Sequence, residues 1–102
     1  MVKVAQMADT ILTENEIDAA LRGLSGWTRM GTRTLRKQFA LGGFKAALAF
    51  VNTVGELAER ADHHPNILIE YSTVTVMLST HDTNGVTARD VRLARQIEAA
   101  SQ

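Results

Sequence analysis

Residues 44–81 read FKAALAFVNTVGELAERADHHPNILIEYSTVTVMLSTH, and this stretch decides the fold. Its first half repeats apolar residues every three or four positions, which is the spacing of one face of an α-helix. These positions are Phe44, Ala47, Leu48, Val51, Val54, Leu57, Ala58 and Ala61. Pro65 lacks an amide proton and restricts the residue before it, so the helix must end upstream of that proline. The sequence predicts one long amphipathic helix here.

The second half of the stretch has the composition of β-strands. Residues 67–80 are rich in β-branched side chains, and apolar Val74, Val76 and Leu78 alternate with their neighbours. The length favours two strands with a turn near Tyr71-Ser72, although no glycine marks it. Asn84-Gly85 ends the second strand. A hairpin is therefore expected directly after the long helix.

The chain upstream of this stretch repeats the order of a helix followed by two strands. Thr13-Glu14-Asn15-Glu16 has the capping-box pattern that begins a short helix, which Gly23 and Gly26 follow. Residues 27–41 carry Gly31 between two runs in which Leu35, Phe39 and Leu41 share one parity, as in a half-buried hairpin. Lys37 interrupts that parity.

A last helix is expected from a second capping pattern, Thr87-Ala88-Arg89-Asp90, followed by apolar Val91, Ala94 and Ile97. Hairpins that alternate with helices favour an antiparallel sheet, because parallel strands would need a crossover between each pair. The fold class expected is α+β, with a four-stranded antiparallel sheet, three helices packed on one face and the order αββαββα.

Bulk properties limit the classes of function. The 102 residues fit one domain, expected at 13–102 after a loose segment 1–12. Eleven basic and eleven acidic residues balance, so neither nucleic acid nor a membrane surface is an expected direct partner. There is no cysteine, and the first residues lack an apolar run long enough for a signal peptide or a membrane span. A cytoplasmic location is the default expectation.

Three histidines occupy informative places: His63 and His64 at the end of the long helix, and His81 after a strand. Glu59 and His63 are four residues apart, so the carboxylate is expected to orient that imidazole and favour its protonated form. A plain helix cap with Glu59 as a surface partner explains the same pair, and the residues alone leave both open. His81 shares parity with Thr73 and Thr75 and should project from the polar side of its strand.

Two other chemistries are weaker. Three histidines and an open position can hold zinc, but neighbouring side chains diverge by about 100° in a helix, so His63 and His64 cannot easily share an ion. Ser79 precedes a histidine-bearing segment without an elbow motif or a glycine-rich oxyanion loop, which argues against a serine nucleophile.

The ordered spacing of several residues is more specific than any one histidine. One ordered pattern resembles the signature of the pterin-4a-carbinolamine dehydratase family. It consists of Glu59, three residues, His63-His64-Pro65, five residues, Tyr71, nine residues, His81, eight residues and Asp90. The resemblance extends through Trp27, through 44–59 and through 78–94, and so covers nearly everything from Thr13 onward.

The resemblance implies an α+β fold with a four-stranded antiparallel sheet and three helices, assembled as a homodimer or homotetramer. Such proteins remove water from a 4a-hydroxytetrahydropterin, the product of an aromatic amino acid hydroxylase, to give a quinonoid dihydropterin in tetrahydrobiopterin recycling. Neither a metal nor an organic cofactor is implied. A small-molecule pterin is the expected partner.

By the same resemblance His63 and His81 would be the acid/base residues, and His64 would position the pterin. Candidate substrate contacts are Glu59, Asp62, Ser79, Thr80, Asp82 and Trp27, the last as a wall for the flat ring. Asp90 also completes the Thr87 capping box and Tyr71 suits a turn, so neither is counted as catalytic, and the sequence leaves open whether each is functional or structural. Asn66-Ile67-Leu68 departs from the acidic and aromatic residues often found after the proline.

A second hypothesis comes from another class of function. Animal relatives of this family also serve as dimerisation cofactors for a homeodomain transcription factor, so the chain could be a binding module without catalysis. No basic or specially apolar stretch of the sequence predicts that role, whereas the complete histidine set favours an enzyme.

Overall fold

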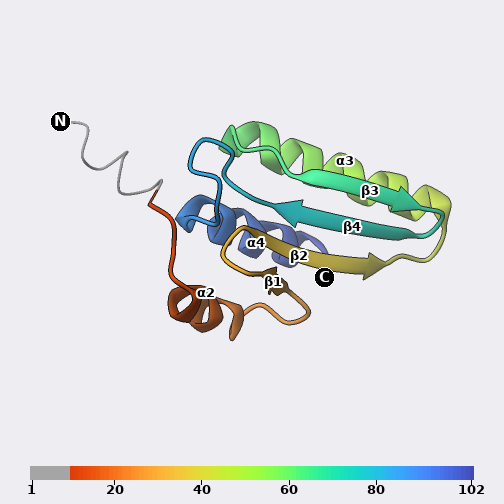
Figure 1. Cartoon of the computed structure of the whole chain (residues 1–102). Helices are drawn as coiled ribbons and strands as arrows, with labels where there is room; N and C mark the ends of the chain where they lie inside the picture. The colour runs from red at the N-terminus through yellow and green to blue at the C-terminus, as the bar shows by residue number, and fades with distance from the viewer. Residues whose placement is uncertain (1–9) are drawn as a thin grey trace.

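The computed structural model describes residues 10–102 and confirms the α+β class and the element order (Figure 1). The elements are α2 (Glu14–Leu21), β1 (Thr28–Met30), β2 (Thr34–Ala40), α3 (Phe44–Ala61), β3 (Asn66–Glu70), β4 (Thr73–Leu78) and α4 (Ala88–Ala100). Most of the segment expected to be loose, 1–12, lies outside the described residues. Within residues 10–102, no helix combines the length and the hydropathy that a membrane crossing requires.

The four strands form one antiparallel sheet in the order β1-β2-β4-β3. Each hairpin contributes one central and one edge strand, so the longest pairing joins β2 to β4. Helices α3 and α4 contact each other, and α3 also packs on β3 and β4. Buried side chains from the sheet, from both long helices and from Ile17 of α2 form one apolar core. Burial of this core is the main driving force for the arrangement.

Both predicted capping boxes are present. Thr13 accepts a hydrogen bond from the Glu16 amide while Glu16 accepts one from the Thr13 amide, and Thr87 with Asp90 closes the second box. The turn predicted without glycine is confirmed as well. Tyr71 adopts a left-handed conformation with φ of 56°, and its side chain is 76% exposed, so the ring meets no crowding there.

The predicted apolar face of α3 was too wide. The buried positions are Ala47, Phe50, Val54 and Ala58. Phe50 was left out of the prediction, yet its ring centroid lies 4.8 Å from that of Phe39 in β2. Phe44 and Leu48 were included but are 49% and 41% exposed. A helix buries only the arc that faces its neighbours, and here that arc is set by the sheet and α4.

Lys37 does not interrupt the alternation of β2. It lies on the inward face between Leu35 and Phe39, and its ammonium group reaches the Ser25 carbonyl and the Glu98 carboxylate, each at 2.8 Å. Its methylene stem packs so closely on Gly26 that a Cβ there would approach the Lys37 Cε to 2.8 Å. The lysine therefore buries its stem and keeps its charge paired at the rim of the core.

Three chain segments meet beside the C-terminal end of α3. Asp62 ends the helix in a left-handed conformation with φ of 51°, and the His63 amide donates to the Ala58 carbonyl. The β4–α4 loop folds back through a bridge between Thr80 and Gly85. The Leu12 amide donates to the Val86 carbonyl at 2.9 Å, so the described start of the chain supports this loop.

Candidate active site

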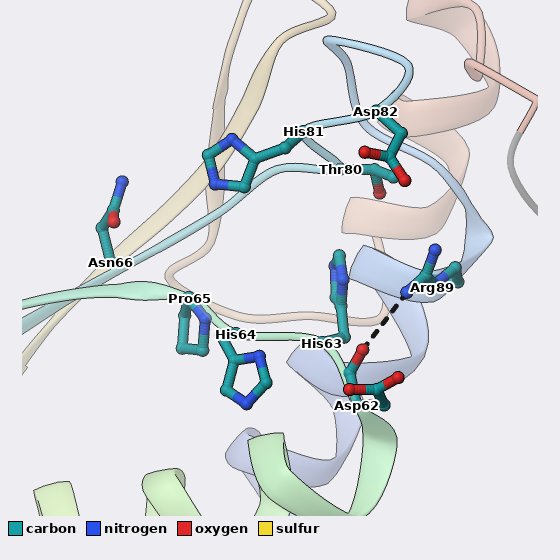
Figure 2. Close-up of a pocket in the computed structure, with 9 residues that line it drawn as sticks. All are labelled: Asp62, His63, His64, Pro65, Asn66, Thr80, His81, Asp82 and Arg89. Atoms are coloured by element: carbon teal, nitrogen blue, oxygen red, sulfur yellow. Dashed lines mark hydrogen bonds between the residues drawn. The ribbon is translucent and has the colours of Figure 1, made fainter.

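A pocket of about 330 Å³ lies between the end of α3, the β4–α4 loop and the first turn of α4 (Figure 2). This volume is at the small end of the range typical of small-molecule sites. The residues that line it are Asp62, His63, His64, Pro65, Asn66, Thr80, His81, Asp82 and Arg89. The fold thus brings together all three histidines, which come from two segments that are remote in sequence.

His63 forms the buried side of the pocket. Its side chain is 7% exposed, and its Nε2 lies 2.5 Å from Asp90 Oδ1. The expected contact with Glu59 is wrong. The four-residue spacing holds only while the chain stays helical, and the left-handed residue Asp62 turns His63 off the helix toward α4. The alternative of an exposed capping imidazole is excluded by the same burial.

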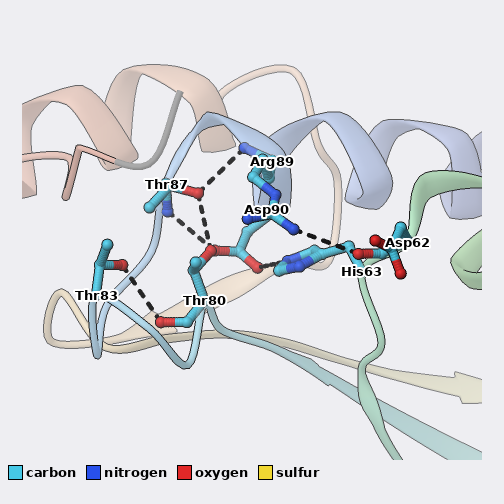
Figure 3. Close-up of polar contacts among 7 residues, drawn as sticks. All are labelled: Asp62, His63, Thr80, Thr83, Thr87, Arg89 and Asp90. Atoms are coloured by element: carbon cyan, nitrogen blue, oxygen red, sulfur yellow. Dashed lines mark hydrogen bonds and ion pairs between the residues drawn. The ribbon is translucent and has the colours of Figure 1, made fainter. Parts of the chain in front are cut away.

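Asp90 combines two roles (Figure 3). Its side chain is fully buried, and Oδ2 accepts hydrogen bonds from the Thr87 amide at 2.9 Å and from Thr80 Oγ1 at 2.8 Å. The sequence interpretation as a capping residue is therefore confirmed but incomplete, because the other oxygen holds His63. The sequence did not predict this contact, because the capping box alone explains an aspartate at this position.

The contact with Asp90 determines which atom of His63 is open. Nε2 faces a carboxylate and so acts as the donor, which leaves Nδ1 without a hydrogen-bond partner. Within the described residues no fully buried side-chain nitrogen or oxygen lacks a partner, so Nδ1, which has none, is accessible. Because His63 lines the pocket, Nδ1 is the atom through which it can exchange a proton with a ligand.

His64 forms a different pair. Its Nε2 lies 2.5 Å from Glu59 Oε2, and the two side chains are 56% and 76% exposed. Figure 2 shows its ring turned toward α3 and away from the rings of His63 and His81. Glu59 is thus a histidine partner, as expected, but of the neighbouring histidine, and it lines an adjoining groove rather than the pocket.

His81 stands in the loop beyond β4, which ends at Leu78, so strand parity does not determine its direction. Its side chain is exposed, as the sequence indicated, and its ring makes no hydrogen bond to a described residue. Figure 2 shows the ring projecting from the loop on the side of the pocket opposite Pro65. Both of its nitrogens are available to a ligand.

The remaining predicted contacts divide into two groups. Asp62, Thr80 and Asp82 line the pocket, whereas Ser79 does not. Trp27 is 4% exposed in the core, where its Nε1 donates to Glu98 Oε1 at 2.9 Å, so the structure does not bring it to the pocket. Its large apolar surface is used for packing instead.

Sequence reasoning missed Arg89 as a lining residue. Its Nη2 donates to the Asp62 carbonyl at 3.3 Å and so ties the first turn of α4 to the end of α3 (Figure 2). The sequence feature that could have indicated a role at the pocket was the position of this arginine next to Asp90 in the capping box. Pro65 and Asn66 also line the pocket, although the sequence analysis named neither as a substrate contact.

The described residues contain no group of three or more histidine, aspartate or glutamate side chains that converge as metal ligands do. The two adjacent histidines diverge, because the ring of His63 is held toward Asp90 and that of His64 toward Glu59.

Known proteins share both the sequence and the fold. The family model described as pterin 4 alpha carbinolamine dehydratase matches residues 10–100. A protein of Roseiflexus castenholzii, provisionally named pterin-4-alpha-carbinolamine dehydratase, is 49% identical over 86% of this chain and 94% of its own. One of Nocardia farcinica with the same provisional name is 46% identical over 90% of this chain and 96% of its own.

Solved structures agree. A Brucella melitensis protein described as a transcriptional coactivator/pterin dehydratase superposes with a TM-score of 0.86 and 37% identity, over 91% of this chain and all of that one. A pterin dehydratase-like protein described as a RuBisCO assembly factor shares the fold, with a TM-score of 0.64 and 24% identity over 74% of this chain and 89% of its own. From the family match and the extent of these identities, the chain belongs to the pterin 4 alpha carbinolamine dehydratase family.

Proposed function

We propose that this protein is a dehydratase that removes water from a 4a-hydroxytetrahydropterin by histidine acid/base catalysis. The observation that carries the proposal is the pair of imidazoles at one pocket: His63 with Nδ1 open and Nε2 held by Asp90, and His81 with a ring free of protein partners. Two proton carriers that line one small pocket suit a reaction that needs one proton delivered and one removed.

The reaction balances with these two groups alone. One imidazolium protonates the hydroxyl on the carbinolamine carbon, and the carbon–oxygen bond breaks to release water. The adjacent ring nitrogen loses its proton to the other imidazole, and its electron pair forms the carbon–nitrogen double bond of the quinonoid dihydropterin. Positioned acid/base groups contribute typically about 10² to 10⁴-fold each, which is the scale expected for His63 and His81.

The surrounding residues suit a polar heterocycle. Asp62 and Asp82 bring carboxylates to the pocket, and Asn66 adds an amide that can donate and accept. These groups complement the amino, imino and carbonyl edge of a pterin. His64 is proposed to contact the substrate only at the outer rim, because its ring is held toward α3 by Glu59.

The decisive experiment generates the 4a-hydroxypterin in situ with an aromatic amino acid hydroxylase and follows its decay. The wild-type protein is expected to accelerate the decay, and His63→Ala and His81→Ala are each expected to lower kcat by about 10²-fold or more. Decay at the uncatalysed rate in the presence of wild-type protein would sink the proposal. His64→Ala serves as the matched histidine variant, and its expected effect is smaller and falls on KM.

The competing proposal, a binding module without catalysis, is separated by the same assay. The Brucella protein is described by both a coactivator and a dehydratase term, and Phe44 and Leu48 form an exposed apolar pair one turn apart on α3. A binding role does not require an imidazole with an accessible nitrogen at a pocket, whereas acid/base catalysis does. Accelerated decay that depends on His63 and His81 therefore favours the enzyme.

A further inference from the structure

We propose that Thr80 and Thr87 are positioning residues, whose hydroxyls form a one-directional chain that fixes Asp90 and, through it, the open nitrogen of His63 (Figure 3). Neither hydroxyl reacts with the substrate in this proposal. The proposal deepens the proposed dehydratase function, and its test by enzyme kinetics rests on that function. Its test by NMR spectroscopy does not depend on activity.

The direction of each hydrogen bond follows from elimination. Asp90 Oδ2 can only accept when the carboxyl group is ionised, so Thr80 Oγ1 donates its single proton to it, at 2.8 Å. Thr80 Oγ1 must then accept in its contact with Thr87 Oγ1, also at 2.8 Å. Thr87 Oγ1 donates there and accepts from the Arg89 amide at 3.2 Å. Every proton in this chain points toward Asp90.

Burial makes the chain hard to replace. Thr80 is 2% exposed, and Thr87 and Asp90 are fully buried, so water has little access to supply a missing donor. An unsatisfied buried polar group is costly, and a carboxylate more so. With Thr80 and the Thr87 amide both on Oδ2, the carboxylate presents Oδ1 to His63 in one orientation.

The consequence for the reaction concerns the ring of His63. While Oδ1 stays in place, Nε2 remains the donor and Nδ1 remains the nitrogen that faces the pocket. If Asp90 loses the Thr80 donor, only the Thr87 amide still holds Oδ2, so the carboxylate can rotate and the imidazole loses its fixed orientation and tautomer. Small displacements of a catalytic group lower kcat more than they change substrate binding.

The test compares Thr80→Val with Thr80→Ser. Valine keeps the shape and removes the donor, whereas serine keeps the donor. By ¹⁵N-resolved NMR, the Nε2–H proton of His63 is expected to be visible and slow to exchange with water in the wild type and in Thr80→Ser. It is expected to broaden or disappear in Thr80→Val. In the dehydration assay, kcat of Thr80→Val should fall about tenfold or more, with KM changed by less than about twofold.

Thr83→Val is the matched control, because Thr83 lies in the same loop and, among residues 10–102, its hydroxyl makes a hydrogen bond only to the Thr80 carbonyl, at 3.3 Å. It should leave the His63 signal and kcat unchanged. If Thr80→Val does not fold, Thr80→Cys, with its weak donor, replaces it and should give a reduced signal and a reduced kcat. A normal His63 signal in the donor-less variant overturns the proposal, as does a kcat loss that serine fails to restore. An inactive wild type with the expected signals would instead overturn the proposed function.

Discussion

Two histidines that line the same pocket are each paired with a carboxylate outside it, and the two pairs differ in almost everything except distance. His63 with Asp90 and His64 with Glu59 both have their nearest atoms 2.5 Å apart. The first pair is 7% and 0% exposed, and the second is 56% and 76% exposed. Separation alone therefore does not tell which pair determines the orientation of its imidazole.

The difference lies in what else holds the carboxylate. Asp90 accepts two further hydrogen bonds from Thr80 and the Thr87 amide, and water has little access to the pair. Glu59 makes no other side-chain hydrogen bond among the described residues, and water competes for both of its oxygens. Exposed pairs contribute typically about 0 to 1 kcal/mol, whereas removal of one partner from a buried pair costs about 3 to 5 kcal/mol.

The largest effect is expected from Asp90→Asn. The amide keeps the shape of the carboxylate, but its NH₂ group would face His63 and donate to Nε2, which moves the ring proton to Nδ1. The nitrogen open to the pocket would then carry a proton in the neutral ring and could not act as a base. The expected result is a loss of about 10² to 10⁴-fold in kcat in the 4a-hydroxypterin decay assay.

Glu59→Gln applies the same chemical change to the exposed pair, and so it serves as the matched variant. Its kcat should stay within about threefold of the wild type, and its free energy of unfolding within about 0.5 kcal/mol, measured by chemical denaturation. Any effect should appear in KM, because His64 lies at the rim of the pocket. A kcat loss as large as that of Asp90→Asn would contradict the division between the two pairs.

The two pairs also mark how far the sequence could be interpreted. Helix periodicity, two capping boxes and strand alternation predicted all seven elements, because these signals are local. The pairing of His63 with Asp90 joins residues 27 positions apart, and it depends on the left-handed turn at Asp62, which no glycine or asparagine marks. The resemblance to a family identified the histidines that line the pocket. It could not show which carboxylate holds which ring.

The residues hardest to predict were those whose role depends on contacts across the fold. Asp90 has a complete explanation as a capping residue, so nothing local required a second role. Trp27 was expected at the pocket because it is a flat aromatic residue within the family resemblance, but tertiary packing placed it against Phe39 in the core, with ring centroids 6.1 Å apart. Local patterns assign a residue to an element. They do not determine the neighbours that it meets across the fold.

The smallest effect is expected at a third ion pair, which tests whether good geometry can compensate for exposure. Arg29 donates to Asp18 through Nε at 2.6 Å and through Nη2 at 3.3 Å, so this pair is bidentate, but it lies at the surface. The hydrogen bond from Arg29, with the attraction of its charge, lowers the pKa of Asp18 below the ordinary value of 3.8, although burial opposes this shift. Asp18→Asn should destabilise the protein slightly near neutral pH.

The sign of the pH dependence follows from the lowered pKa of Asp18. A carboxyl group that is more acidic in the folded state stabilises the fold above its unfolded pKa and loses that contribution as pH falls through its folded pKa. The unfolding curves of wild type and Asp18→Asn should therefore differ near neutral pH and converge below the ordinary value of 3.8. Chemical denaturation at a series of pH values measures the difference in unfolding free energy, with added salt as a control, because screening weakens exposed pairs.

A difference that persists at the acid end would mean that the aspartate stabilises the fold by something other than its charge. If the loss of unfolding free energy near neutral pH reached the roughly 3 to 5 kcal/mol expected for a broken buried pair, burial would no longer explain the contrast between the two histidine pairs.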